Sequence, residues 1–128
     1  MMLVAVAMIG FTACDKTEEM SDEELINAVA NKNMFYGKVS ADNEDINGLW
    51  ITAVFEADKT FTLYMTESRK EAKKEYSEDD IFDEGTWTVS DKKLVATSAD
   101  DGAVYNFEIS NSGKKLTLET SSFKVVLD

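Results

Sequence analysis

The feature that most constrains this chain is an alternation of apolar and polar residues that begins at Met34 and continues to Leu127. Turn-forming pairs such as Asp58-Lys59, Asp91-Lys92 and Asp101-Gly102 interrupt it at short intervals. This spacing predicts strands at residues 34–40, 49–57, 60–66, 70–76, 81–89, 93–98, 103–110, 114–119 and 122–127. Hairpins in series form an antiparallel meander, and closure removes its exposed edges. We therefore predict an all-β, lipocalin-like barrel of about eight strands at residues 34–128.

The alternation also assigns one face of each strand to the interior. The residues predicted to face inward are Leu49, Ile51, Ala53, Phe55, Phe61, Leu63, Met65, Trp87, Val89, Tyr105, Phe107, Ile109, Leu116, Leu118, Phe123 and Val125. Those predicted to face water are Thr60, Thr62, Tyr64, Thr86, Thr88, Asn106, Glu108, Lys115, Thr117 and Lys124. Gly85 lies inside a predicted strand, where we expect a bulge or a corner.

Large apolar side chains in a small barrel either fill the interior or line a space for one small ligand. The predicted ligand-contacting residues of the interior are Trp50, Phe61, Met65, Trp87, Tyr105 and Phe107. An apolar cavity of roughly 300 Å³ or more would favour a bound small molecule. A packed interior with an exposed apolar patch would instead favour contact with a protein partner.

The N-terminal residues 1–13 predict an export signal, because they contain an apolar run that is too short to span a bilayer. Phe11-Thr12-Ala13-Cys14 resembles the bacterial lipobox, which implies that Cys14 is lipidated. Residues 14–33 would then hold the lipidated cysteine, an acidic tether and a short helix. No basic residue precedes Cys14, so we interpret the recorded start as lying within a longer signal. The alternative is a structural cysteine buried on a first strand.

A capping box predicts the short helix, because Ser21 is followed three positions later by Glu24. The helix should run from Asp22 to Asn31, with Leu25, Ile26 and Val29 on one face against the mouth or side of the barrel. The alternative is a helix that binds a partner.

Several short segments of the chain carry a family resemblance: Tyr36-Gly37, the loop from Ala41 to Gly48, Asp58-Lys59-Thr60-Phe61, Gly85-Thr86-Trp87 and Lys93-Leu94. Together they resemble the lipocalin-like lipoproteins of Bacteroidetes and the N-terminal barrel domain of NlpE-type envelope-stress lipoproteins. The resemblance implies a barrel in the cell envelope, anchored at the outer membrane, that holds a small apolar ligand or an envelope component. The NlpE-type loop carries a CxxC that this chain lacks, so copper and thiol chemistry are not implied.

Composition excludes several classes of function. The chain has no histidine and one cysteine, which removes His-based catalysis, His-based metal sites and disulfide chemistry. Its formal net charge of -12 repels phosphate backbones, so we expect no nucleic-acid partner. We expect a monomeric, non-enzymatic protein without a cofactor, attached to a membrane by its lipid anchor. A protein-interaction or stress-sensor module with a filled barrel is the main alternative.

Two acidic segments remain as candidate sites. The loop with Asp42, Asp45 and Asn47 offers oxygen ligands for calcium, but Val54 stands where an EF-hand needs a glutamate, and a solvated loop is the simpler interpretation. Residues 78–84 hold five carboxylates, which suit either a mobile polar loop or a recognition surface. A hydrolase would require clustered carboxylates with raised pKa values in a cleft.

Overall fold

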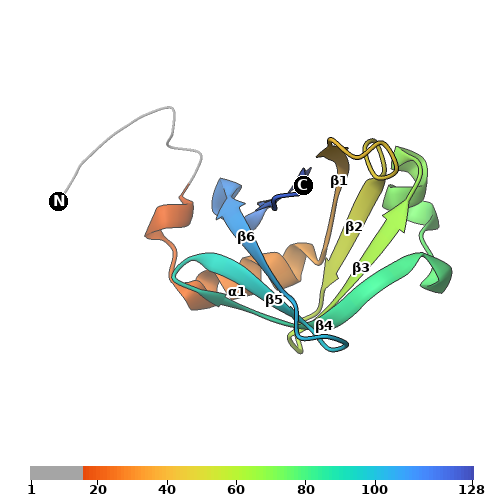
Figure 1. Cartoon of the computed structure of the whole chain (residues 1–128). Coiled ribbons are helices and arrows are strands. Elements are labelled where there is room, and N and C mark those ends of the chain that lie inside the picture. Colours follow the sequence, from red (N-terminus) through yellow and green to blue (C-terminus); the bar gives the residue numbers. More distant parts are fainter. Residues whose placement is uncertain (1–15) are drawn as a thin grey trace.

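The computed structural model describes residues 16–128, which form a closed antiparallel barrel of eight strands in sequential order (Figure 1). Each strand pairs with its neighbours in the chain, and the first strand pairs with the last. The strands are β1 (Met34–Ala41), β2 (Trp50–Phe55), β3 (Thr60–Thr66), β4 (Ile81–Ser90), β5 (Lys93–Ser98), β6 (Val104–Ser110), β7 (Lys115–Glu119) and β8 (Phe123–Leu127). The all-β barrel predicted from the alternation is confirmed.

The barrel closes at a seam between β1 and β8, where Val39 lies opposite Val125. Farther along the seam, Tyr36 and Asp128 exchange backbone hydrogen bonds. Gly37 lies between these contacts, and a Cβ atom at this position would collide with the backbone carbonyl oxygen of Val126. Glycine therefore permits the close approach that the two strands need.

The predicted alternation is confirmed along most of the barrel. Most of the residues expected to face inward are buried, whereas Leu49, Met65, Tyr105 and Phe123 are partly exposed near strand ends. None of the residues expected to face water is fully buried. The prediction omitted one set of interior residues, which comes mainly from β1 and β5: Phe35, Val39, Leu94, Ala96 and Leu127.

Aromatic rings pack the interior around Phe55, which is fully buried. Its ring lies edge-on to Trp87 at a centroid distance of 5.4 Å and to Phe107 at 6.0 Å. It also contacts Phe35 and Phe61. Such edge-to-face pairs add to the free energy gained by burial, so this part of the barrel is a packed core.

The helix α1 (Asp22–Lys32) covers one end of the barrel, as the apolar face of its sequence predicts. The expected capping box is present, because Ser21 accepts from the Glu24 amide and the Glu24 carboxylate accepts from the Ser21 amide. Leu25 and Val29 are fully buried against the barrel core. Neither α1 nor any other helix within residues 16–128 is long and apolar enough to cross a membrane.

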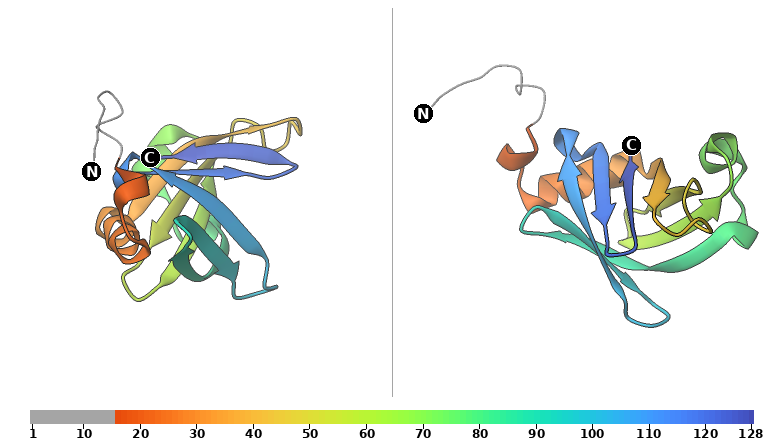
Figure 2. Two further views of the ribbon diagram at one scale, coloured as in Figure 1. Left: turned by 90° about the vertical axis from the view of Figure 1, so that its left-hand side faces the viewer. Right: turned by 45° about the horizontal axis from the view of Figure 1, so that its top comes forward.

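We call the end beneath α1 the closed end and the opposite end the open end (Figure 2). The closed end includes the turns at residues 56–59, 91–92 and 111–114, the last of which begins with η6 (Asn111–Gly113). The open end includes the loop at residues 42–49, the β5–β6 connection at 99–103 and the β7–β8 turn at 120–122. The two ends differ in amino-acid composition, and α1 covers the closed end but not the open end.

The prediction of an acidic tether after Cys14 is partly wrong, because η3 (Thr17–Glu19) packs on the barrel. The Thr17 hydroxyl accepts from the Ser112 amide at 2.8 Å, and the Lys92 ammonium contacts the Glu18 carbonyl oxygen. These polar contacts hold residues 17–19 against the barrel, although their acidic composition had suggested a segment without contacts to it. Cys14 lies outside the described residues.

The strand predicted at residues 70–76 is also wrong: the segment forms a short π-helical turn, η4 (Glu71–Glu75), followed by η5 (Glu78–Asp80). Its two apolar residues, Ala72 and Tyr76, are four positions apart, which is a helical spacing. Ala72 is buried on the outer face of the barrel, where its carbonyl oxygen accepts from the Thr52 hydroxyl at 2.5 Å.

The bulge expected at Gly85 lies three residues earlier. Leu63 is opposite Asp83 but Tyr64 is opposite Ile81, so Phe82 is the extra residue in β4. Gly85 serves a different purpose, because a Cβ atom there would collide with the backbone carbonyl oxygen of Thr97 in β5.

Candidate functional site

Three polar side chains meet at the open end of the barrel. Asp83, Ser98 and Tyr105 come from the adjacent strands β4, β5 and β6. The Ser98 hydroxyl donates to one carboxylate oxygen of Asp83 at 2.7 Å, and the Tyr105 hydroxyl donates to the other at 2.5 Å. We call these residues the rim cluster. It lies beside the packed core, because the Tyr105 ring meets the Phe61 ring edge-on.

The hydrogen bonds of the rim cluster set the charge state of its members. Partial burial raises the pKa of Asp83, but hydrogen bonds from Tyr105, Ser98 and the Glu84 amide outweigh that effect, so the pKa lies below its usual value. Burial raises the pKa of Tyr105, and the neighbouring Asp83 carboxylate raises it further. At neutral pH the cluster therefore holds one carboxylate anion and a protonated tyrosine.

A hollow of about 550 Å³ lies beside the rim cluster, and we call it the β4 hollow. It is shallow and broadly open to solvent, and its volume lies within the size range of small-molecule sites. Apolar and acidic residues share its lining. The lining residues are Thr60, Phe61, Ile81, Phe82, Asp83, Glu84, Gly85, Ala99 and Asp100. An apolar molecule that carries a positive charge would match this combination.

A second hollow of similar volume lies at the closed end, between η3, the β4–β5 turn and β6. Charged residues supply most of its lining, among them Glu18, Lys92, Lys93 and Glu108. The Lys92 ammonium is already engaged with the Glu18 carbonyl oxygen. Ile109 is the one apolar side chain in the lining of this hollow, which lies away from the rim cluster.

The structure brings some of the predicted ligand-contacting residues together. Phe61, Trp87 and Phe107 are buried and join through Phe55, and the Trp87 indole donates to the Glu56 carbonyl oxygen at 3.1 Å. Met65 packs against the core from its edge. These side chains fill the region in which a ligand was predicted to lie.

Trp50 is not in the barrel interior. The neighbouring residue Ile51 is buried, and alternation along β2 therefore turns Trp50 to the outer face. There its ring packs against Tyr36 at a centroid distance of 6.2 Å, and the Arg69 guanidinium lies over the Tyr36 ring. The prediction followed the size of Trp50 and ignored the period of its own strand.

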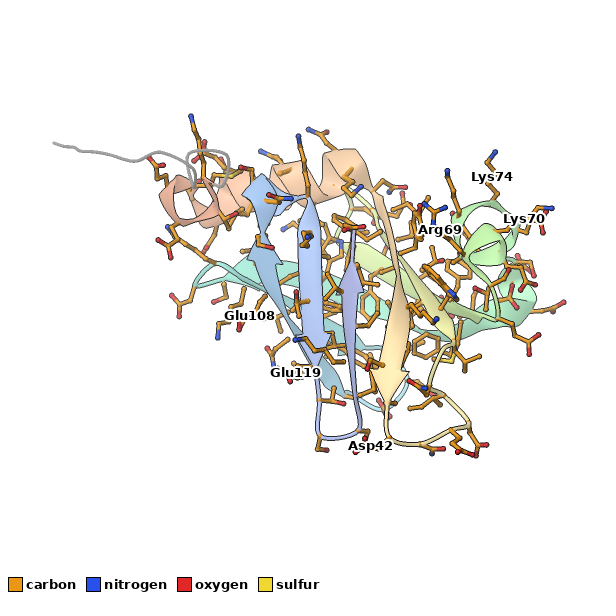
Figure 3. The ribbon with its side chains drawn as sticks, turned by 90° about the horizontal axis from the view of Figure 1, so that it is seen from above. Asp42, Arg69, Lys70, Lys74, Glu108 and Glu119 are labelled. Atoms are coloured by element: carbon orange, nitrogen blue, oxygen red, sulfur yellow. The ribbon has the colours of Figure 1, made fainter. Side chains whose placement is uncertain are left out.

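The loop considered for calcium lies at the open end, with Asp42 at the tip farthest from α1 (Figure 3). The Asn47 side-chain oxygen accepts from the Ala41 amide at 3.0 Å, and the Asn43 oxygen accepts from the Asp45 amide at 2.9 Å. These contacts use two of the potential ligand oxygens to shape the loop. No group of metal-ligating side chains is found among residues 16–128.

Sequence reasoning missed Asp83 and Ser98. Asp83 was grouped with the carboxylates of residues 78–84, which the charge run presented as one segment. The informative signal was the alternation backward from Trp87, which puts Gly85 and Asp83 on the same inward face. A carboxylate at an inward position needs hydrogen-bond donors, and Ser98 and Tyr105 occupy inward positions on the next two strands.

Comparison of the chain with protein-family models, with curated proteins and with solved structures finds no match. The rim cluster and the β4 hollow are therefore interpreted from their own chemistry.

Proposed function

We propose that this protein is a non-enzymatic lipoprotein of the cell envelope that binds a small ligand in the β4 hollow. The ligand would combine an apolar body with a basic group. The observation that carries the proposal is the side-by-side placement of Phe61 and Phe82 with the ionised Asp83 in one hollow. The resemblance to lipocalin-like lipoproteins and the lipobox-like sequence at Cys14 support the envelope location.

The position of the ligand differs from the one that the sequence favoured. The aromatic core around Phe55 occupies the closed half of the barrel, so the proposed site lies at the rim and not in the centre. Apolar surface removed from water contributes roughly 25 cal/mol per Å² to binding. The carboxylate adds selectivity for a cation over an anion.

The rim cluster supports a binding role better than a catalytic one. The Ser98 hydroxyl donates a hydrogen bond to Asp83, but the lowered pKa of Asp83 makes it too weak a base to activate Ser98 as a nucleophile. The raised pKa of Tyr105 disfavours a nucleophilic phenolate. A hydrolase that uses paired carboxylates needs one of them with a raised pKa. The pKa of Asp83 is lowered, so this carboxylate does not meet that requirement.

Calorimetric titration with octylamine and octanoate tests the ligand class, because the two molecules share an alkyl body and differ in charge. We expect octylamine to bind more tightly, and Asp83→Asn to weaken it several-fold. Glu119→Gln is the matched control, because Glu119 is an exposed carboxylate on β7 that does not line the β4 hollow. Equal binding of both probes would contradict a basic ligand. Native mass spectrometry of protein from its own host would then identify any retained molecule.

The lipid anchor is tested by Cys14→Ser. The thiol is the acylation site in this proposal, so the variant should move from the membrane fraction to the soluble fraction. Ser21→Ala, which keeps the cysteine and alters only the helix cap, should remain with the membrane. A Cys14→Ser protein that still sediments with membranes would refute lipidation.

A second candidate function is protein interaction through a filled barrel. Phe82 is 42% exposed and Val104 is 53% exposed, and both lie on strands at the open end. This candidate predicts that Val104→Ser weakens association with one stoichiometric envelope protein. Octylamine binding should be unaffected by that change, because Val104 does not line the β4 hollow.

A further inference from the structure

The N-terminal segment is fastened to the closed end at three places. Near its start, Thr17 accepts from the Ser112 amide in η6. At the start of α1, the Asp22 carboxylate accepts from the amides of Asp91 and Lys92 in the β4–β5 turn, at 3.2 and 2.9 Å. At its end, Asn33 exchanges backbone and side-chain hydrogen bonds with the end of β2.

These contacts leave little chain between the barrel and the proposed anchor. The Lys16 amide donates to the Ser112 hydroxyl at 3.3 Å, so the segment is in contact with the barrel from Lys16 onward. Cys14 precedes Lys16 by two residues. Two residues of extended chain span at most about 7 Å. An acylated Cys14 would therefore hold η6 and its neighbours within a headgroup layer of the bilayer.

The distribution of charge favours the same arrangement. Two of the closed-end turns, at residues 91–93 and 111–115, hold Lys92, Lys93, Lys114 and Lys115 against the acidic residue Asp91. The neighbouring elements η3 and α1 and the turn at residues 56–59 add seven carboxylates and two lysines. At the open end, the connections at residues 42–49, 99–103 and 120–122 hold five carboxylates and no basic residue. An anionic lipid surface attracts the four lysines of the closed-end turns and repels the carboxylates of the open end.

We propose that the closed end of the barrel lies against an anionic lipid surface, with the turns at residues 91–93 and 111–115 toward the headgroups. The open end then points away from the bilayer. The strand β1 has eight residues, which at a tilt of about 40° places the open end about 20 Å above the closed end. This orientation rests on the proposed lipid anchor, and it presents the rim cluster and the β4 hollow to the aqueous side.

Site-specific fluorescence quenching tests this orientation. Acylation consumes the sole native thiol, so an introduced cysteine can carry the only label. Lys114→Cys and Ser121→Cys form a matched pair, because both positions are exposed and flank opposite ends of β7. The lipidated proteins would be placed in vesicles of equal parts phosphatidylethanolamine and phosphatidylglycerol, with a quencher on the lipid headgroups.

We expect the label at position 114 to be quenched several-fold more strongly than the label at 121. A label at Lys74→Cys, on the flank of the barrel (Figure 3), should give an intermediate value. Equal quenching at 114 and 121 in protein that floats with the vesicles would overturn the orientation and leave the anchor intact. Protein without an acyl mass, or protein that does not float, would overturn the anchor itself.

Charge reversal tests the part played by the lysines. In the Lys114→Cys background, Lys93→Glu should lower quenching on the anionic vesicles and leave it unchanged on phosphatidylcholine vesicles. Lys74→Glu is the control, because it makes the same charge change on the flank. Equal effects of the two reversals would remove the lysine turns from the proposed contact.

Discussion

The closed end and the open end use the same eight strands for different purposes. At the closed end, α1 covers a core in which Phe55 touches four other aromatic rings, and hydrogen bonds tie the N-terminal segment to the turns. At the open end, inward positions carry the polar rim cluster, and the loops are acidic. The difference indicates that stability is concentrated beneath α1, which leaves the rim free to carry polar groups that a core would exclude.

The largest effect is expected for Phe55→Ala at the closed end. Removing the central ring leaves a cavity among four aromatic side chains, so we expect the free energy of unfolding to fall by about 3–5 kcal/mol. Phe82→Ala at the open end is the control, because Phe82 is 42% exposed whereas Phe55 is fully buried, and we expect it to lower the free energy of unfolding by about 1 kcal/mol. Denaturant unfolding measures both values, and similar losses would break the distinction between the ends.

A smaller effect is expected for Asp83→Asn at the open end. The variant loses the charge that strengthens two hydrogen bonds, which we expect to cost about 1–2 kcal/mol at neutral pH. The lowered pKa of Asp83 means that its stabilisation is complete above the unfolded-state pKa near 4. It is lost as the pH falls through the folded-state value.

The pH profile of stability checks that sign. Wild-type protein should lose more stability than Asp83→Asn as the pH falls below about 4. Glu119→Gln, which removes an exposed carboxylate elsewhere at the open end, should keep the wild-type profile. Parallel profiles for wild type and Asp83→Asn would show that the rim cluster contributes nothing to acid stability.

The smallest effect is expected for Ser21→Ala, which removes one half of the capping box at α1. We expect a loss of about 1 kcal/mol, because the Glu24 amide loses its hydroxyl acceptor. Hydrogen exchange should increase in residues 22–25 and remain unchanged at the rim cluster. A uniform increase across the barrel would indicate that α1 and the strands unfold as one unit.

Sequence reasoning was most successful where one period held over a whole strand. Ile51, Ala53 and Phe55 alternate without interruption, and all three are buried as predicted. The prediction failed where it was based on the composition of a segment and not on the spacing of its apolar residues. The lysines and glutamates of residues 70–76 concealed the helical spacing of Ala72 and Tyr76.

The candidate site was predicted less well than the fold, because it depends on contacts between strands. The pairing of Gly85 with Ser98 and of Ala96 with Tyr105 brings the Asp83 partners together, and a single strand does not reveal that register. The bulge at Phe82 is set in the same way by the pairing of β3 with β4. The pattern along one strand specifies which face of the sheet a residue occupies. To know which residues lie next to it, one needs the register of the complete sheet.

The seam between β1 and β8 has a consequence for the order of folding. The barrel closes only when the last strand of the chain reaches the first, so every earlier hairpin waits with an open edge until residues 123–127 are present. Contacts between distant parts of a sequence form slowly. Closure of the barrel is therefore expected to be the last and slowest step of folding, after all the hairpins have formed.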